Sequence, residues 1–244
     1  MDIQEELNLP FPLRPYQEEG VKFLNSNQSA LLGDDMGLGK TVQVIVALKK
    51  IYSETGIFRC LIVVPNSLKT NWLNEFETWF PGTLVTDLKG NLENRSYTLE
   101  TYNGFVICTY EQLRASFDAN HRIPNFDFVI YDEVQRLKNS SSQVYMSAYG
   151  VIADKVWAMS GTPLENSVND IVNIFNIIKS GVIQKGLNEN EISTAISPYL
   201  LRRLKKDVLE ELPDLIEQNV YIDLGPDQAK EYSCLLYTSP SPRD

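Results

Sequence analysis

A glycine-rich segment with a lysine and a threonine lies near the start of the chain, at residues 31–41, with the sequence LLGDDMGLGKT. Gly37 and Gly39 allow the backbone to turn tightly enough to direct several N–H groups at one anion. Thr41 is expected to open a helix, and a helix N-terminus favours a phosphate group. This order of residues places Lys40 for the β- and γ-phosphates of a nucleotide and the Thr41 hydroxyl for Mg2+.

Asp34 stands where the strict phosphate-loop pattern, G-x-x-x-x-G-K-[ST], has glycine. The alternative interpretation is a strand, turn and helix in which GKT is incidental. A second segment, FVIYDE, argues against that alternative because it ends an apolar run with two carboxylates. In a nucleotide site Asp132 would hold Mg2+ through its water shell, and Glu133 would orient the attacking water. Acidic residues also end strands for purely structural reasons, so it is the two features together that indicate a nucleotide site.

The elements that must position these residues are short apolar runs alternating with helical patterns. Because the runs are continuous and do not alternate with polar residues, both faces of the sheet should be covered, as in a parallel sheet. Repeated strand–helix units predict an α/β lobe, with ligands at the carboxyl ends of the strands. The expected strands are 29–33, 60–65, 105–110, 126–133 and 155–161, and the expected helices are 41–52, 67–80 and 140–152.

The pattern changes after about residue 180. Residues 180–191 are a polar segment, 196–213 are expected to form a helix with a basic cluster, and 219–232 suggest a new strand, turn and helix. We expect a first lobe over residues 1–200 and a linker with the beginning of a second lobe over 201–233. The basic cluster is either a solvated helix face or a DNA contact, and its members are Arg202, Arg203, Lys205 and Lys206.

The last eleven residues, CLLYTSPSPRD (234–244), break from the preceding helical pattern without a turn signal. One reading frame of a transposase adaptor used in sequencing libraries encodes these residues in order. We therefore interpret them as an adaptor-derived tail and exclude them from fold predictions. On this interpretation the chain is a C-terminally truncated piece of a longer protein.

The composition is typical of a globular protein, with 43% hydrophobic and 22% charged residues and a net charge of -10. That charge argues against a uniformly basic nucleic-acid binder but allows a local groove. No apolar run is long enough to span a membrane, and the N-terminus lacks the apolar core of a secretion signal. Cys60 and Cys108 lie in apolar runs and are expected to be buried thiols. We expect an intracellular protein, in the cytoplasm and nucleoid or in the nucleus, without membrane partners.

Several blocks in order, over about residues 12–232, resemble the first RecA-like motor lobe of the Swi/Snf-type DNA-dependent ATPases, a branch of helicase superfamily two. They include LRPYQEEGVKFL (13–24), DDMGLGKT (34–41), DEVQRLKN (132–139) and WAMSGTPLEN (157–166). The family's own phosphate loop begins with an acidic residue, which accounts for Asp34. The resemblance implies a RecA-like phosphate-loop fold and the cofactors ATP and Mg2+. The implied nucleotide-binding residues are Arg14 and Gln17 for adenine, then Gly37, Leu38, Gly39, Lys40 and Thr41 for the phosphates and Mg2+.

The resemblance also implies contacts to DNA. LIVVPNSLKTNWLNEFETWFP (61–81) and VICTYEQLR (106–114) are similar to blocks that touch the DNA backbone, through Ser67, Lys69 and Thr109 here. The family usually has DEAH where this chain has DEVQ, so Gln135 takes the place of histidine and can still form hydrogen bonds. Residues that would couple hydrolysis to DNA are Gln135, Ser160, Gly161 and Thr162.

The leading hypothesis is an ATP-dependent motor on double-stranded DNA that translocates or remodels DNA-bound proteins, catalysed through Lys40, Asp132 and Glu133. The alternative is a strand-separating helicase on DNA or RNA. For this chain by itself, a nucleotide-binding module without turnover is a third possibility. In such motors the nucleotide lies between two lobes, and the second lobe supplies arginine fingers.

Overall fold

The computed structural model describes residues 3–56, 58–117, 124–161 and 167–208, together with Gly225 and Gln228. The chain divides into two compact units, Met1–Leu209 and Glu210–Asp244, and the sheet with its helices belongs to the first unit. Apart from Gly225 and Gln228, the elements expected over 219–232 and the tail at 234–244 lie outside the described residues. The first unit extends past residue 200, the expected end of the lobe.

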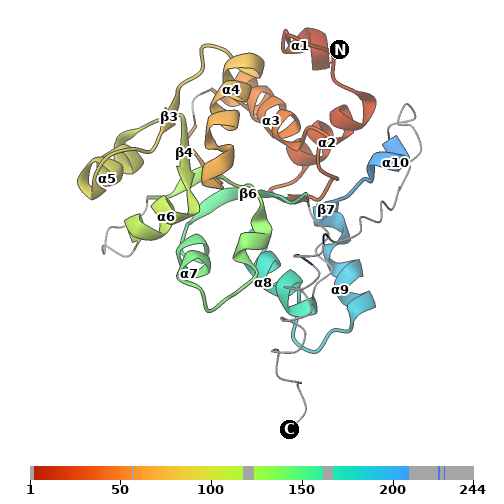
Figure 1. Cartoon of the computed structure of the whole chain (residues 1–244). Coiled ribbons are helices and arrows are strands. Elements are labelled where there is room, and N and C mark those ends of the chain that lie inside the picture. The colour runs from red at the N-terminus through yellow and green to blue at the C-terminus, as the bar shows by residue number, and fades with distance from the viewer. Residues whose placement is uncertain are drawn as a thin grey trace. The chain divides into compact units, whose positions relative to one another are not determined.

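One sheet runs through the first unit, with the strand order β3-β4-β2-β5-β6-β1-β7 (Figure 1). Every neighbouring pair in it is parallel. The strands are β1 (Ser29–Leu32), β2 (Cys60–Val64), β3 (Val85–Asp87), β4 (Phe105–Thr109), β5 (Phe126–Tyr131), β6 (Ala153–Met159) and β7 (Leu200–Leu201).

Helices cover both faces of this sheet, with α2, α3 and α4 on one side and α6, α7 and α8 on the other (Figure 1). The α-helices are α1 (Ile3–Glu6), α2 (Pro15–Ser26), α3 (Lys40–Thr55), α4 (Lys69–Trp79), α5 (Leu92–Thr101), α6 (Tyr110–Phe117), α7 (Gln143–Tyr149), α8 (Val168–Ile178), α9 (Glu189–Ile196) and α10 (Lys205–Val208). The short 3-10 helices are η1 (Asn66–Leu68), η2 (Val134–Leu137) and η3 (Ser197–Tyr199).

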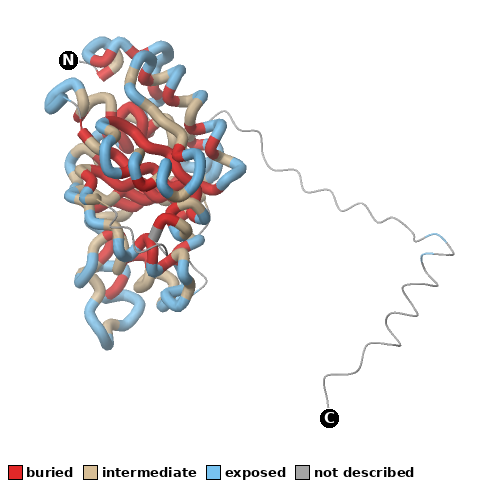
Figure 2. The backbone as a smooth tube through the Cα atoms, turned by 90° about the vertical axis from the view of Figure 1, so that its left-hand side faces the viewer, coloured by how far each residue is buried: buried red, intermediate tan, exposed pale blue. Residues whose placement is uncertain are grey.

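The strands separate two apolar cores. Ala30 and Leu32 of β1 pack into the core that contains Trp72, whereas Leu31 packs into the core that contains Ile174. Successive side chains of a strand point to opposite faces, so a strand covered on both sides is apolar throughout. Figure 2 shows this as buried strands running through the centre of the unit.

The α/β class, the parallel sheet and the five predicted strands are confirmed, with boundaries shifted by no more than two residues. The helix expected over 196–213 is wrong in its first part. There the chain forms η3 and then β7, because Leu200 and Leu201 pair with Leu31 and Leu32 at the sheet edge. The strands β3 and β7 were not predicted. Within the part of the chain that the structure describes, no helix is both long and apolar enough to cross a membrane.

Candidate active site

The glycine-rich segment forms the turn between β1 and α3, at the carboxyl edge of the sheet. Gly37 and Gly39 have φ values of 84° and 73°, in the left-handed region that favours glycine. α3 begins at Lys40, directly after Gly39. The predicted turn and helix start are therefore present, with Thr41 in the first turn of the helix.

Lys40 reaches back across this turn. Its ammonium donates to the carbonyl oxygens of Asp34 and Asp35, at 2.7 and 3.3 Å. Burial lowers the pKa of Lys40, and the negative charges of Glu133, Asp34 and Asp132 act against that shift. The lysine of the loop and the carboxylates after β5 thus share one electrostatic environment.

Asp132 follows β5 and is buried beside the loop. Trp72 of α4 donates its indole N–H to Asp132 Oδ2 at 2.8 Å, and the Glu133 amide donates to Oδ1 at 2.9 Å. Burial raises the pKa of Asp132 to about 6, against the hydrogen bond from Trp72, which lowers it. The Tyr110 hydroxyl donates to the Asp132 carbonyl at 2.6 Å, which holds the backbone at this point. These hydrogen bonds fix the orientation of the carboxyl group, and its pKa lies close to neutral pH.

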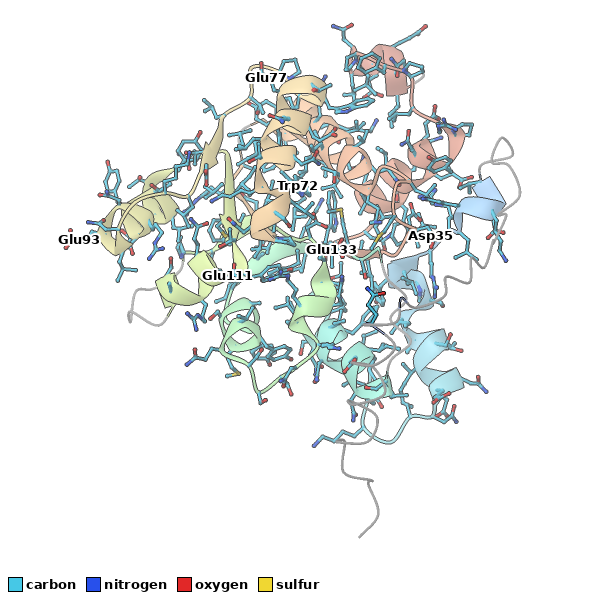
Figure 3. The ribbon with its side chains drawn as sticks, viewed as in Figure 1. Asp35, Trp72, Glu77, Glu93, Glu111 and Glu133 are labelled. Atoms are coloured by element: carbon cyan, nitrogen blue, oxygen red, sulfur yellow. The ribbon has the colours of Figure 1, made fainter. Side chains whose placement is uncertain are left out.

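Glu133 occupies a strained backbone position. Its φ is 50°, a value that is uncommon for a residue with a side chain. The Gln135 amide donates to Glu133 Oε2, and the Ser160 hydroxyl donates to Gln135 Oε1 at 3.0 Å. Gln135 therefore joins the carboxylate after β5 to the end of β6. Figure 3 labels Glu133, Trp72 and Asp35, which come from the end of β5, from α4 and from the glycine-rich turn.

Gly161 closes the site from the β6 side, because a Cβ added there would lie 3.3 Å from Lys40 Nζ. β6 lies between β1 and β5, and Ala158 pairs with Leu31 on one side and Tyr131 on the other. The strand order therefore brings the predicted residues Lys40, Asp132, Glu133, Gln135, Ser160 and Gly161 to one edge. Thr162 lies outside the described residues.

Gln17 of α2 contacts the glycine-rich turn. Its side-chain nitrogen donates to the Leu38 carbonyl at 3.3 Å, and its oxygen accepts from the Arg14 amide at 3.0 Å. A Cβ at Gly39 would lie only 2.5 Å from the Gln17 nitrogen, so a side chain there would displace the end of Gln17, in addition to being disfavoured by the positive φ. Arg14 is exposed at the start of α2.

The residues expected to contact DNA have different surroundings. Ser67 is exposed on η1, just after β2. Lys69 is buried and places its charge inside the lobe, in an ion pair with Asp87 and a 2.8 Å bond to Gln112 Oε1. This arrangement does not favour Lys69 as a contact to a DNA phosphate, because its ammonium is already paired with the half-buried Asp87 carboxylate.

Thr109 is buried at the end of β4 and caps α6. Its hydroxyl accepts from the Gln112 amide at 3.1 Å, while its own amide donates to Gln112 Oε1 at 2.8 Å. This reciprocal pair is a capping box. Gln112 also bonds the Leu88 carbonyl at 2.6 Å and so ties β3 to α6. The T-x-x-Q spacing in TYEQ is the sequence signal that could have identified Gln112.

The basic cluster after β7 fits neither of the two expectations as a whole. Lys205 and Lys206 are exposed, but the Arg203 side chain is 10% exposed and pairs with the fully buried Asp34. No local pattern signals this pair, because its members are 169 residues apart. Likewise, Leu68, Trp72, Phe76 and Phe80 recur every fourth residue, and this spacing predicts Trp72 only as a core residue.

Comparison with known proteins agrees with this geometry. The SNF2-related domain family matches residues 16–189. An uncharacterized ATP-dependent helicase of Mycoplasma genitalium is 34% identical over 90% of this chain and 23% of its own length. A Caenorhabditis elegans homologue of a SWI/SNF-related regulator of chromatin is 31% identical over 92% of this chain and 27% of its own length.

A solved structure is similar over nearly the whole chain. The Sulfolobus solfataricus SWI2/SNF2 ATPase core, in complex with double-stranded DNA, is 30% identical with a TM-score of 0.75, and the match covers 97% of this chain and 54% of that chain. This chain thus spans about a quarter of the curated relatives' length and about half of the solved core.

Proposed function

The chain belongs to the family of SNF2-related domains, and from this premise we propose that it is the ATP-binding lobe of an ATP-dependent motor on double-stranded DNA. One observation carries the proposal: Lys40 of the loop lies within electrostatic reach of both Asp132 and Glu133 at the carboxyl edge of a parallel sheet. Phosphoryl transfer to water requires a cation that binds the phosphates, a carboxylate that holds the metal ion and a carboxylate that orients the attacking water.

In this proposal the turn around Gly37, Leu38 and Gly39 holds the phosphates by backbone N–H groups, and Lys40 exchanges its carbonyl partners for phosphate oxygens. Mg2+, when bound with ATP, neutralises charge that develops on the phosphates. The Thr41 hydroxyl and the Asp132 carboxylate fit this ion, because both are hard oxygen donors. Each Asp132 oxygen already accepts one hydrogen bond, which suits a contact made through the ion's water shell.

Glu133 orients the attacking water, and Gln135 fixes the Glu133 carboxylate. Gln17 and Arg14 are proposed to bind the adenine base, since an amide both donates and accepts. For this, Gln17 exchanges its bonds to the backbone for bonds to the base.

Coupling to DNA is proposed to run through Gln135, Ser160, Gly161 and Thr162. The support is the hydrogen-bonded chain from Glu133 through Gln135 to Ser160. For contacts to the DNA backbone we retain Ser67, which is exposed. We also retain Thr109, because its hydrogen bond to the Gln112 amide orients the backbone N–H groups at the start of α6. Lys69 is given a structural role instead, in the ion pair with Asp87.

For the longer protein we propose double-stranded DNA and DNA-bound proteins as partners, with a second RecA-like lobe that completes the ATP site. The location would be the nucleus, or the cytoplasm and nucleoid of a bacterium, and the relatives that support this include a homologue of a chromatin regulator and a bacterial helicase. Strand separation is the competing activity.

Binding of a fluorescent ATP analogue tests the site directly. The chain should bind the analogue in a Mg2+-dependent manner, and Lys40→Ala should abolish binding. Lys185→Ala, at an exposed lysine away from the loop, is the matched control and should bind normally. Equal binding by Lys40→Ala would contradict the proposal. For the longer protein, duplex DNA should stimulate hydrolysis, whereas equal stimulation by RNA together with unwinding of a blunt duplex would favour the helicase alternative.

A further inference from the structure

A buried ion pair lies beneath the glycine-rich turn, between residues that are far apart in sequence. Arg203 donates from Nε to Asp34 Oδ1 at 3.0 Å and from a terminal nitrogen to Oδ2 at 2.6 Å. Asp34 is fully buried, and the Arg203 side chain is 10% exposed. A buried carboxylate is tolerated only with such partners, and the planar guanidinium provides a two-pronged match. The conformation of the turn thus depends on Arg203, which follows the edge strand β7.

The backbone of the same segment is attached to the turn as well. The Gly33 amide donates to the Leu201 carbonyl at 2.7 Å, and the Asp35 amide donates to the Arg203 carbonyl at 3.0 Å. The Lys205 amide donates to Asp35 Oδ2 at 2.9 Å. Residues 200–205, which we call the connector, therefore contact each of the three residues that begin the turn.

These contacts lead to the group proposed to bind phosphate. The carbonyl oxygens of Asp34 and Asp35 are the atoms that hold the Lys40 ammonium. Gln43 of α3 accepts from Arg203 at 2.8 Å and donates to Asp34 Oδ2 and to the Leu38 carbonyl, both at 3.2 Å. Arg203 thus reaches both ends of the turn: Asp34 directly, and Leu38 through Gln43.

Resting on the proposed ATP site, we propose that Arg203 is a positioning residue for the phosphate loop, and that nucleotide binding and docking of the connector stabilise each other. Coupling between two binding events is reciprocal. A docked connector holds Asp34 and Asp35 where Lys40 and the loop amides can meet phosphate, so a bound nucleotide must in turn favour the docked connector. Arg203 need not touch the nucleotide for this to operate.

Hydrogen exchange on the unaltered chain tests the coupling without any mutation. Mg2+ with a saturating fluorescent ADP analogue should slow exchange of the Lys205 amide, which reports docking from the connector side. In Lys40→Ala the Lys205 amide should keep its nucleotide-free protection and lose the response to nucleotide. Binding of the analogue with unchanged exchange at Lys205 would overturn the coupling and leave the proposed function intact. Absence of binding by the unaltered chain would overturn the proposed function, and this inference with it.

Substitutions test the positioning role. Arg203→Gln should weaken binding of the ADP analogue by about tenfold, within the usual range for coupled sites. Arg203→Lys keeps the charge without the two-pronged geometry and should show a smaller loss. Asp34→Asn combined with Arg203→Gln should lose no more than the weaker-binding single variant, because both changes act on one pair.

Asp87→Asn is the matched control, because it breaks a largely buried pair with Lys69 on β3, which four strands separate from β1 and the loop. It should lower the melting temperature and leave the analogue affinity unchanged. Equal affinity of Arg203→Gln and Asp87→Asn for the analogue would show that the Arg203 pair serves stability alone and would overturn the positioning role.

Discussion

Trp72 shows how one side chain connects the core to the candidate chemistry. Its ring is fully buried in the core between the sheet and α4, and its indole N–H donates to Asp132 Oδ2 at 2.8 Å. The hydrogen bond favours the charged carboxylate, whereas burial disfavours it. The charge state of the proposed magnesium ligand is therefore set partly by a core residue.

Trp72→Phe should weaken Mg2+-dependent binding of the ATP analogue at neutral pH, because loss of the donor raises the pKa of Asp132 further. Stability should fall by about 1–3 kcal/mol, since a buried acceptor loses its partner.

Trp157→Phe is the matched control, because Trp157 is also fully buried and donates its indole N–H to the Asn27 carbonyl at 3.0 Å. It should lower stability and leave the Mg2+ dependence unchanged. Calorimetry and Mg2+ titration of each variant measure the two effects, and equal Mg2+ dependence in both would contradict the role given to Trp72.

The Asp132 carboxyl group also predicts a pH dependence. With its pKa raised to about 6, the group is charged above that value and protonated below it. A proton and Mg2+ with its water shell compete for this carboxylate, so Mg2+-dependent affinity should be present above pH 6 and decline as the pH falls through about 6. The phosphates of the nucleotide titrate as well, so the comparison is with Asp132→Asn, which should lack the extra decline. Identical pH profiles for the two proteins would show that Asp132 does not act on the ion.

At the scale of elements, the join between the turn and α3 depends on Gly39. Its left-handed φ of 73° favours glycine, and a Cβ at this residue would lie 2.5 Å from the Gln17 nitrogen, which would have to move. Gly39→Ala should therefore cost about 1–2 kcal/mol of backbone strain and should also displace Gln17, with a loss of ATP-analogue affinity.

Gly56, at the other end of α3, is a matched control for this change. It has a similar φ of 83°, but a Cβ added there meets nothing within 4 Å. Gly56→Ala should lower the melting temperature at least as much, because the Gly56 ψ of -154° lies in a region that only glycine readily adopts, and it should have no effect on affinity. If both alanine variants bind the analogue as well as the parent chain does, the Gln17 contact has no part in nucleotide binding.

The elements that could be predicted from the sequence are those with a local signal. The five predicted strands each contain a continuous apolar run, and the loop and carboxylate motifs follow two of them. β3 has three residues and β7 has two, too few to show any periodicity, and each is defined by pairing with a distant strand. Pairing with β1 overrides the helical pattern around Leu200.

The absence of a local sequence signal also explains which parts of the site were not predicted. Lys40, Asp132 and Glu133 belong to short motifs and could be named in advance. The partners of Asp34 and Asp132 could not be, because Arg203 and Trp72 meet them only through the fold. Lys69 was expected to contact DNA because residues 61–81 resemble a DNA-contacting block of the family, whereas its partner Asp87 lies on the unpredicted β3.

At the scale of the whole first unit, the strand order arranges the proposed functions along one edge of the sheet. The turn that follows β1 lies toward one end, and Ser67 and Thr109 follow or end β2 and β4 toward the other. Between them β5 and β6 carry Glu133, Gln135 and Ser160, which are joined by hydrogen bonds. β6 and β5 separate the loop from the proposed DNA side, and the Gln135 bridge joins the ends of these two intervening strands.

The residues that the structure describes form one wall of the proposed ATP site, and from this follows a prediction about turnover. The chain should bind Mg2+ and ATP weakly and should release phosphate at a negligible rate, with or without duplex DNA. Arginine fingers contributed from outside such a lobe raise turnover by roughly a thousand-fold or more.

Phosphate release is measured for this chain and, in parallel, for a longer family member that contains a second lobe. DNA should stimulate the longer protein much more strongly, because its second lobe can close a second wall over the nucleotide. Robust hydrolysis by this chain that Lys40→Ala abolishes would show instead that the residues after β1, β5 and β6 are sufficient for the reaction.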